Sequence, residues 1–164
     1  LCVAEGEGRN AVWLAAQGCV VTGFDASEVG LRKAAALAAA RGQQVALHRS
    51  DVEAWDWDRP FDLVVACFIQ FADPQQRAGL FQGLRRALAP GGRLMLHGYT
   101  PEQGALGTGG PPHRENMYTV DMLRAAFDDL RILRLAAYET VLREGTADEG
   151  RSALIDLIAD RPAA

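Results

Sequence analysis

Two closely spaced glycines near the start of the chain and two aspartates further along could together hold a ligand. Gly6 and Gly8 follow an apolar segment and precede a segment of helical periodicity. Glycine allows a tight turn and lets a ligand approach the main chain closely. The pattern Gly6-x-Gly8-x-x-Ala11 also satisfies the dinucleotide-binding fingerprint, and an ordinary tight turn between a strand and a helix remains the structural alternative.

Asp25 and Asp51 each end an apolar segment. A carboxylate at the end of the second strand can accept hydrogen bonds from both hydroxyls of a ribose, as in sites for adenosine-containing ligands. Asp51 could reach the exocyclic amine of an adenine. The alternatives are a helix cap for Asp25, a role that Ser27 also suits, and a surface turn for Asp51.

Short apolar runs alternate with amphipathic helical segments, a pattern typical of a largely parallel α/β sheet. We expect strands at residues 1–4, 19–24, 44–48, 61–67 and 93–98, and helices at 10–17, 27–41, 74–88 and 120–127. Ser27 and Thr119 are expected to cap two of these helices. Residues 104–112 form a loop, either a plain connector or a lid that faces a substrate.

The C-terminal part follows a different pattern. Two strand-like segments, 131–143 and 151–159, are joined by a connection over residues 144–150 that is too short for a crossover helix. They should therefore pair antiparallel. The length and the lack of a boundary predict a single domain over residues 1–164.

Taken together, these features resemble the class I S-adenosylmethionine-dependent methyltransferase family over essentially the whole chain. The resemblance lies in Ala4–Gly8 as the glycine-rich loop, in Asp25 and Asp51 as the two acids, and in residues 61–65 and 88–94 around the fourth and fifth strands. The closing antiparallel pair is also a family feature, which dinucleotide dehydrogenases lack. Residues 6–15, 109–112 and 117–119 are most similar to the tellurite-resistance and thiopurine-type small-molecule branch.

The resemblance implies a three-layer, doubly wound, Rossmann-like α/β fold with a seven-stranded sheet, mostly parallel with a C-terminal antiparallel pair. It implies S-adenosylmethionine as cofactor, with S-adenosylhomocysteine as product. The residues implied to hold it are Ala4, Glu5, Gly6, Gly8, Asn10, Asp25, Ala26, Asp51, Val52 and Cys67. Gln70, Phe71 and Tyr99 are expected to bind the acceptor.

The sequence departs from the family pattern at two positions. Cys2 stands where an acidic residue usually helps to hold the methionine amino group, and Ala4 stands where a glycine is common. Glu5 could supply the missing carboxylate. We also expect the natural protein to continue upstream, because the helical segment that normally covers the cofactor cleft is absent from these residues.

No catalytic residue is assigned from the sequence. His97 and Tyr118 are candidates, with a structural hydrogen bond and core packing as their alternatives. The expected reaction is in-line transfer of the methyl group to a small molecule such as a thiol or a chalcogen oxyanion, for which a base is optional. The competing hypotheses are a domain of an NAD(P)-dependent oxidoreductase and a non-catalytic domain that binds S-adenosylmethionine.

Composition limits the partners. The net charge is −4 and the cationic residues are scattered, which argues against nucleic acid and anionic membranes. No apolar run is long enough to cross a bilayer. The cysteines Cys2, Cys19 and Cys67 lack paired spacing, so no metal site is expected and a cytoplasmic location is the simpler interpretation. The oligomeric state and the identity of the acceptor are left open.

Overall fold

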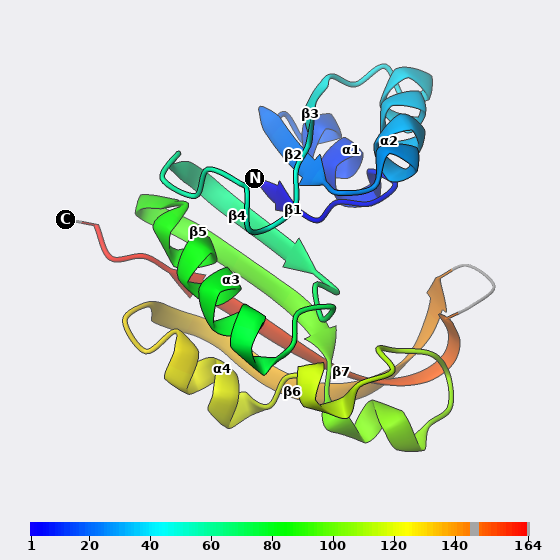
Figure 1. Cartoon of the computed structure of the whole chain (residues 1–164), viewed down its shortest axis with the longest axis vertical. Helices are drawn as coiled ribbons and strands as arrows, with labels where there is room; N and C mark the ends of the chain where they lie inside the picture. The colour runs from blue at the N-terminus through cyan, green and yellow to red at the C-terminus, as the bar shows by residue number, and fades with distance from the viewer. Residues whose placement is uncertain (145–147, 164) are drawn as a thin grey trace.

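The strands form one seven-stranded sheet in the computed structural model, which describes residues 1–144 and 148–163 (Figure 1). The strand order is β3-β2-β1-β4-β5-β7-β6. Strands β1 to β5 pair in parallel, whereas β7 pairs antiparallel with both β5 and β6. The strands are β1 (Cys2–Val3), β2 (Val21–Asp25), β3 (Val45–Arg49), β4 (Phe61–Cys67), β5 (Leu88–Tyr99), β6 (Arg131–Glu144) and β7 (Asp148–Asp160).

Two helices begin at the caps predicted from the sequence. Ser27 Oγ accepts a hydrogen bond from Gly30 N at 3.1 Å, and Thr119 Oγ1 accepts one from Met122 N at 3.2 Å. A third helix, Pro74–Arg86, begins with a capping box formed by Asp73 and Gln76. The helices are α1 (Arg9–Ala16), α2 (Glu28–Ala40), α3 (Pro74–Arg86) and α4 (Val120–Ala126), with short 3₁₀ turns at Pro101–Ala105 and Arg114–Asn116.

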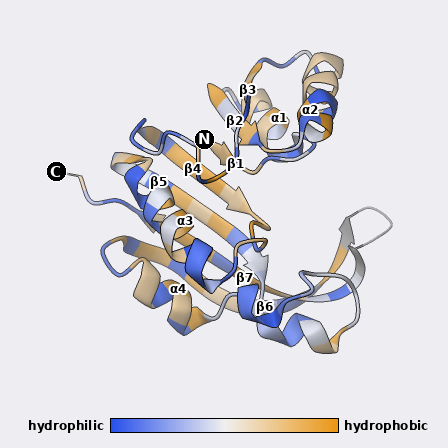
Figure 2. Cartoon of the chain, in the orientation of Figure 1, coloured by the Kyte–Doolittle hydropathy of each residue, from blue (hydrophilic) through white to orange (hydrophobic). Residues whose placement is uncertain are grey.

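Helices cover both faces of the sheet. Side chains alternate along a strand, so the neighbours Val64 and Val65 of β4 point to opposite faces. Val65 belongs to a cluster with Ala11 of α1, whereas Val64 belongs to the large core cluster with Leu84 of α3. The fold is therefore three-layered, and the apolar colouring of β4 and β5 in Figure 2 follows from their central position.

The predicted fold class is confirmed: seven strands, mostly parallel, with a C-terminal antiparallel pair. The predicted boundaries agree with the structure within three residues except at the start of β5, which begins at Leu88 instead of residue 93, after the end of α3. The register against β4 shifts between Phe61 and Leu63, so the Pro-Gly-Gly segment remains in the sheet as an irregularity. Of the predicted connection over 144–150, residues 145–147 lie outside the described residues.

Within the described part of the chain, none of the helices combines the length and the apolar character needed to cross a membrane. The same residues contain no cluster of three or more histidine, cysteine, aspartate or glutamate side chains suited to a metal ion.

Candidate functional site

A cleft of about 490 Å³ opens where the parallel strands end. We call it the strand-end cleft. Its lining includes residues that directly follow β1, β3 and β4, together with the last residue of β2. It is lined by Ala4, Phe24, Asp25, Ala26, Ser50, Asp51, Val52, Glu53, Phe68, Phe71, Ala72 and Gln76. The cleft thus brings together five of the predicted cofactor residues and Phe71, and ligands of parallel α/β sheets bind at this edge.

Backbone strain is concentrated at this cleft. Among the described residues, Ala4 (φ 48°) and Phe68 (φ 55°) are the only non-glycine residues with positive φ, and both line the cleft. The left-handed conformation costs roughly 1–2 kcal/mol per residue for a side chain with a Cβ atom. Strain of this kind is found preferentially at functional sites.

Asp25, the last residue of β2, lines the cleft and is hydrogen-bonded to the glycine loop that follows β1. Its Oδ2 atom accepts a hydrogen bond from Gly6 N at 2.8 Å, and its Oδ1 atom accepts one from Ser27 N at 2.7 Å. A carboxylate has about four lone-pair positions, so both oxygens can accept further hydrogen bonds. Asp25 therefore fixes the loop and keeps acceptor capacity for two ligand hydroxyls.

Asp51 has both of the roles that the sequence left open. Its Oδ1 atom accepts hydrogen bonds from Glu53 N at 3.0 Å and Ala54 N at 2.7 Å, which closes a turn. The same side chain lines the strand-end cleft. Its Oδ2 atom has no hydrogen-bond partner among residues 1–144 and 148–163, so one oxygen is available to a ligand amine.

Phe24, which lines the cleft, packs within a cluster of aromatic rings. The ring of Phe24 stacks on Trp55 with centroids 4.3 Å apart and an interplanar angle of 11°, and it meets the edge of Trp57 at 5.8 Å. Trp57 is held in turn by a 2.9 Å hydrogen bond from Nε1 to Val52 O. Phe24 is fully buried by these contacts, so the aromatic cluster supports the cleft from beneath, and the exposed ring at the cleft is that of Phe71.

A second cavity, of about 400 Å³, adjoins this cleft and is lined by two prolines of the 104–112 loop. We call it the proline cavity. Its lining is Phe68, Gln70, Phe71, Tyr99, Pro111, Pro112, His113 and Asn116. Phe68 and Phe71 also line the strand-end cleft, so the two sites share a wall. All three residues predicted to bind the acceptor, Gln70, Phe71 and Tyr99, line this cavity.

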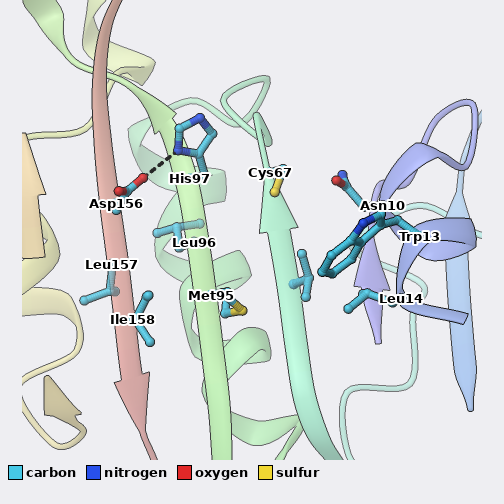
Figure 3. A pocket seen from close by; sticks show the side chains of 11 residues that line it. Asn10, Trp13, Leu14, Cys67, Met95, Leu96, His97, Asp156, Leu157 and Ile158 are labelled. Carbon is cyan, nitrogen blue, oxygen red and sulfur yellow. Dashed lines mark hydrogen bonds and ion pairs between the residues drawn. The ribbon is translucent and has the colours of Figure 1, made fainter. Parts of the chain in front are cut away.

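A third cavity, of about 320 Å³, lies on the face of the sheet that carries α1, between α1 and strands β4, β5 and β7 (Figure 3). We call it the open-face cavity. Asn10 and Cys67, two predicted cofactor residues, line it together with His97. The remaining lining is Trp13, Leu14, Val65, Met95, Leu96, Asp156, Leu157 and Ile158.

His97 forms a pair with Asp156 at the edge of the open-face cavity. Its Nδ1 atom lies 2.8 Å from Asp156 Oδ1, across strands β5 and β7 (Figure 3). Asp156 also accepts hydrogen bonds from Arg134 Nε at 3.0 Å and Tyr138 Oη at 3.2 Å. Burial alone would raise the pKa of Asp156, but these hydrogen bonds, from His97 foremost, lower it. The ionised carboxylate accepts the Nδ1 proton, so His97 makes the structural hydrogen bond considered from the sequence.

A family profile described as a methyltransferase domain matches residues 1–92, more than half of the chain. The chain belongs to the methyltransferase domain family. It is an S-adenosylmethionine-dependent methyltransferase domain, which favours this cofactor over the nicotinamide cofactor that the glycine fingerprint also allowed. No curated protein sequence matches the chain.

Solved structures share the fold of the methyltransferase domain. TehB from Haemophilus influenzae aligns with a TM-score of 0.80 and 14% identity over 98% of this chain. A methyltransferase from Methanosarcina mazei gives 0.80 and 17% over 99% of this chain and 92% of its own. The N-methyltransferase NodS from Bradyrhizobium japonicum WM9, in complex with S-adenosylhomocysteine, gives 0.73 and 16% over 98% of this chain and 76% of its own. This chain spans 57% of the TehB chain.

The strand-end cleft fits the adenosine part of S-adenosylmethionine. Asp25 offers acceptor positions for ribose hydroxyls, Asp51 offers one oxygen to an adenine amine, and Phe71 offers an exposed aromatic ring. The loop leaves room as well, because a Cβ atom added at Gly6 meets nothing within 4 Å. This open backbone surface is available to the rest of the cofactor.

Glu5 and Gly8 have structural roles in the methyltransferase domain and do not line the strand-end cleft. Glu5 Oε1 accepts a 2.7 Å hydrogen bond from Ala11 N and so stabilises the start of α1. Burial raises the pKa of Glu5, and the helix amide hydrogen bonds only partly offset it. Gly8 has φ 86°, and a Cβ atom there would lie 2.6 Å from Ala34 Cβ of α2. Whether Glu5 also holds the methionine amino group stays a prediction.

Tyr118 lies apart from the three cavities. It is almost fully buried in the main core, and its ring meets the edge of Phe81 with centroids 5.6 Å apart. Burial raises the pKa of its phenol, and the hydroxyl has no partner among the described residues. Tyr118 is therefore a core residue in this structure, as in the packing interpretation considered from the sequence.

Sequence reasoning missed three residues that line the strand-end cleft or the proline cavity, Ser50, Phe68 and Asn116. Phe68 directly follows β4 and Ser50 directly follows β3, so a search for the first residue after every parallel strand would have found both. Asn116, by contrast, reaches the proline cavity from a distant 3₁₀ turn. No local pattern marks it.

Proposed function

We propose that this domain transfers the methyl group of S-adenosylmethionine to a small-molecule acceptor bound in the proline cavity. The observation that carries the proposal is the wall of Phe68 and Phe71 shared by the strand-end cleft and the proline cavity. A molecule in the cavity would lie beside the cofactor. This agrees with the small-molecule branch that the sequence resembles, for which the 14% likeness to TehB supports the fold alone.

The proposal assigns cofactor contacts to the predicted residues according to their positions. Asp25 accepts the ribose hydroxyls, Asp51 accepts the adenine amine, and Ala26 and Val52 pack against the adenosine. Ala4 and Gly6 face the methionine part from the loop. The family resemblance adds Glu5, Gly8, Asn10 and Cys67, which border the loop or the open-face cavity.

The chemistry asked of the protein is modest. When bound, S-adenosylmethionine supplies a methyl group attached to a positively charged sulfur atom. The chain has to hold the acceptor in line with that bond and to exclude water, since proximity accounts for much of the rate in such a reaction. Phe68, Phe71 and Tyr99 can do both, because they surround the space with apolar surface. A thiol acceptor needs no dedicated base.

A transfer assay with an aromatic thiol tests the proposal. The chain would be incubated with S-adenosylmethionine and thiophenol, and formation of S-adenosylhomocysteine and of methyl phenyl sulfide would be followed. We expect both products in equal amounts, with a rate that saturates with thiophenol. Binding of the cofactor without turnover on thiophenol or any other small acceptor would instead indicate the non-catalytic binding domain.

A further inference from the structure

We infer that the acceptor is a neutral, ring-containing molecule that carries a hydrogen-bond donor, and that oxyanions are excluded. This inference rests on the proposed function, because it names the class of molecule that the proline cavity admits. It narrows the range of acceptors predicted from the sequence, which included both thiols and chalcogen oxyanions.

Rings and prolines dominate the lining of the proline cavity. Phe68 and Tyr99 pack against each other with centroids 4.9 Å apart and an interplanar angle of 39°. Phe71, which is 55% exposed, continues the aromatic surface towards the cleft. Pro111 and Pro112 close the side formed by the 104–112 loop. Aromatic surfaces of this kind favour planar, carbon-rich ligands, and the volume suits one small molecule.

The lining offers no guanidinium or ammonium group to an anion. None of the described residues that line the cavity is arginine or lysine. Arg77, on the neighbouring α3, donates to the Glu115 carbonyl at 2.7 Å instead. His113 is the one basic residue in the lining, and its Nδ1 atom lies 3.7 Å from the Glu115 carboxylate. The protein lining therefore offers a tellurite or selenite ion no arginine or lysine to replace its lost hydration.

Polar groups in the cavity set a second requirement. The Gln70 amide is already occupied, because it donates to Tyr99 O and accepts from Tyr99 N, both at 2.7 Å. Asn116 is buried, with 5% exposure, and its Oδ1 atom has no hydrogen-bond partner in the described structure. A buried acceptor without a partner is costly. A ligand O–H or N–H group that reached Asn116 would remove that cost.

Calorimetric titration of the chain saturated with S-adenosylhomocysteine tests the inference with four probes. These are 2-naphthol, 2-methoxynaphthalene, sodium selenite and sodium tellurite. We expect 2-naphthol to bind saturably and more tightly than 2-methoxynaphthalene, which has no donor, and neither oxyanion to bind. Asn116→Leu should weaken 2-naphthol about five- to tenfold, the loss expected for one hydrogen bond, and leave 2-methoxynaphthalene unchanged.

The outcomes separate this inference from the proposed function. If S-adenosylhomocysteine does not bind, the proposed function fails. If it binds but an oxyanion binds as tightly as 2-naphthol, or if no naphthalene compound binds, the acceptor class is wrong while the cofactor site stands. If Asn116→Leu does not fold, Phe71→Ala takes its place, because that side chain is 55% exposed. It should weaken both naphthalene compounds, and unchanged affinities would overturn the inference.

Discussion

The Oδ2 atom of Asp25 accepts a 2.8 Å hydrogen bond from the main-chain amide of Gly6. The carboxylate that ends β2 thus holds the loop that follows β1, across two parallel strands. One residue both shapes the glycine loop and faces the strand-end cleft. Changes at Asp25 should therefore affect cofactor binding in two ways.

Asp25→Ala should weaken S-adenosylhomocysteine binding by about 1–3 kcal/mol, or roughly 5- to 150-fold, because ribose hydroxyls lose their acceptor. Isothermal titration calorimetry measures the change directly. Glu28→Ala is the matched control, since Glu28 is a nearby exposed carboxylate that pairs with Arg32 and Arg49 outside the cleft. Equal affinities for both variants would remove the ribose assignment.

Ala4→Gly should increase the free energy of unfolding by about 0.5–1 kcal/mol, the balance between relieved left-handed strain and the greater entropy of unfolded glycine. The reason is the φ of 48° at Ala4. Urea denaturation monitors the change. Ala36→Gly on the exposed side of α2 should have the opposite sign. A destabilised Ala4→Gly variant would show that the alanine side chain contributes more than its strain costs.

Gly6→Ala and Gly8→Ala should differ in stability although both residues have positive φ, 62° and 86°. Gly6→Ala should cost about 1 kcal/mol, the strain of the left-handed conformation. Gly8→Ala should cost roughly 1–3 kcal/mol more, because its Cβ atom would overlap Ala34. Thermal and urea unfolding compare them. Similar losses would mean that α1 and α2 can separate at this contact without cost.

Asp160→Asn should destabilise the edge where β5, β7 and β6 meet. Hydrogen bonds from Arg93, at 2.7 and 3.0 Å, and from Arg131, at 2.9 Å, lower the pKa of Asp160 from 3.8 to about 2. A lowered carboxyl pKa gives stability that is present above the unfolded value and lost as the pH falls.

The difference in unfolding midpoint between wild type and Asp160→Asn should accordingly shrink between about pH 4 and pH 2. Asp128→Asn, at an exposed carboxylate, serves as the control. A difference that stays constant over this range would mean that the ionised form of Asp160 is not what stabilises the strands.

The sequence predicted the fold well because its signals are local. Apolar runs, helix caps at Ser27 and Thr119 and the short connection before β7 each depend on neighbouring residues. The start of β5 was predicted wrongly at residue 93, because Gly92 lies tight against the Phe61 and Ala89 main chains in a sheet irregularity. That close approach depends on β4 and is not visible in the sequence of β5.

The site was predictable to the extent that it follows strand ends. Asp25 and Asp51 could be found in this way, and both line the strand-end cleft. The pair of His97 and Asp156 could not, because an antiparallel register brings together residues that lie far apart in sequence. Asn116 enters the proline cavity for a similarly non-local reason.

Calorimetric titration of the chain with S-adenosylhomocysteine and, in parallel, with NADH tests the central claim most directly. The strand-end cleft, with Asp25 and Asp51 at two of its strand ends, predicts saturable binding of S-adenosylhomocysteine with one site per chain and no binding of NADH. Binding of NADH alone, or of neither ligand, would contradict the assignment of this cleft to S-adenosylmethionine.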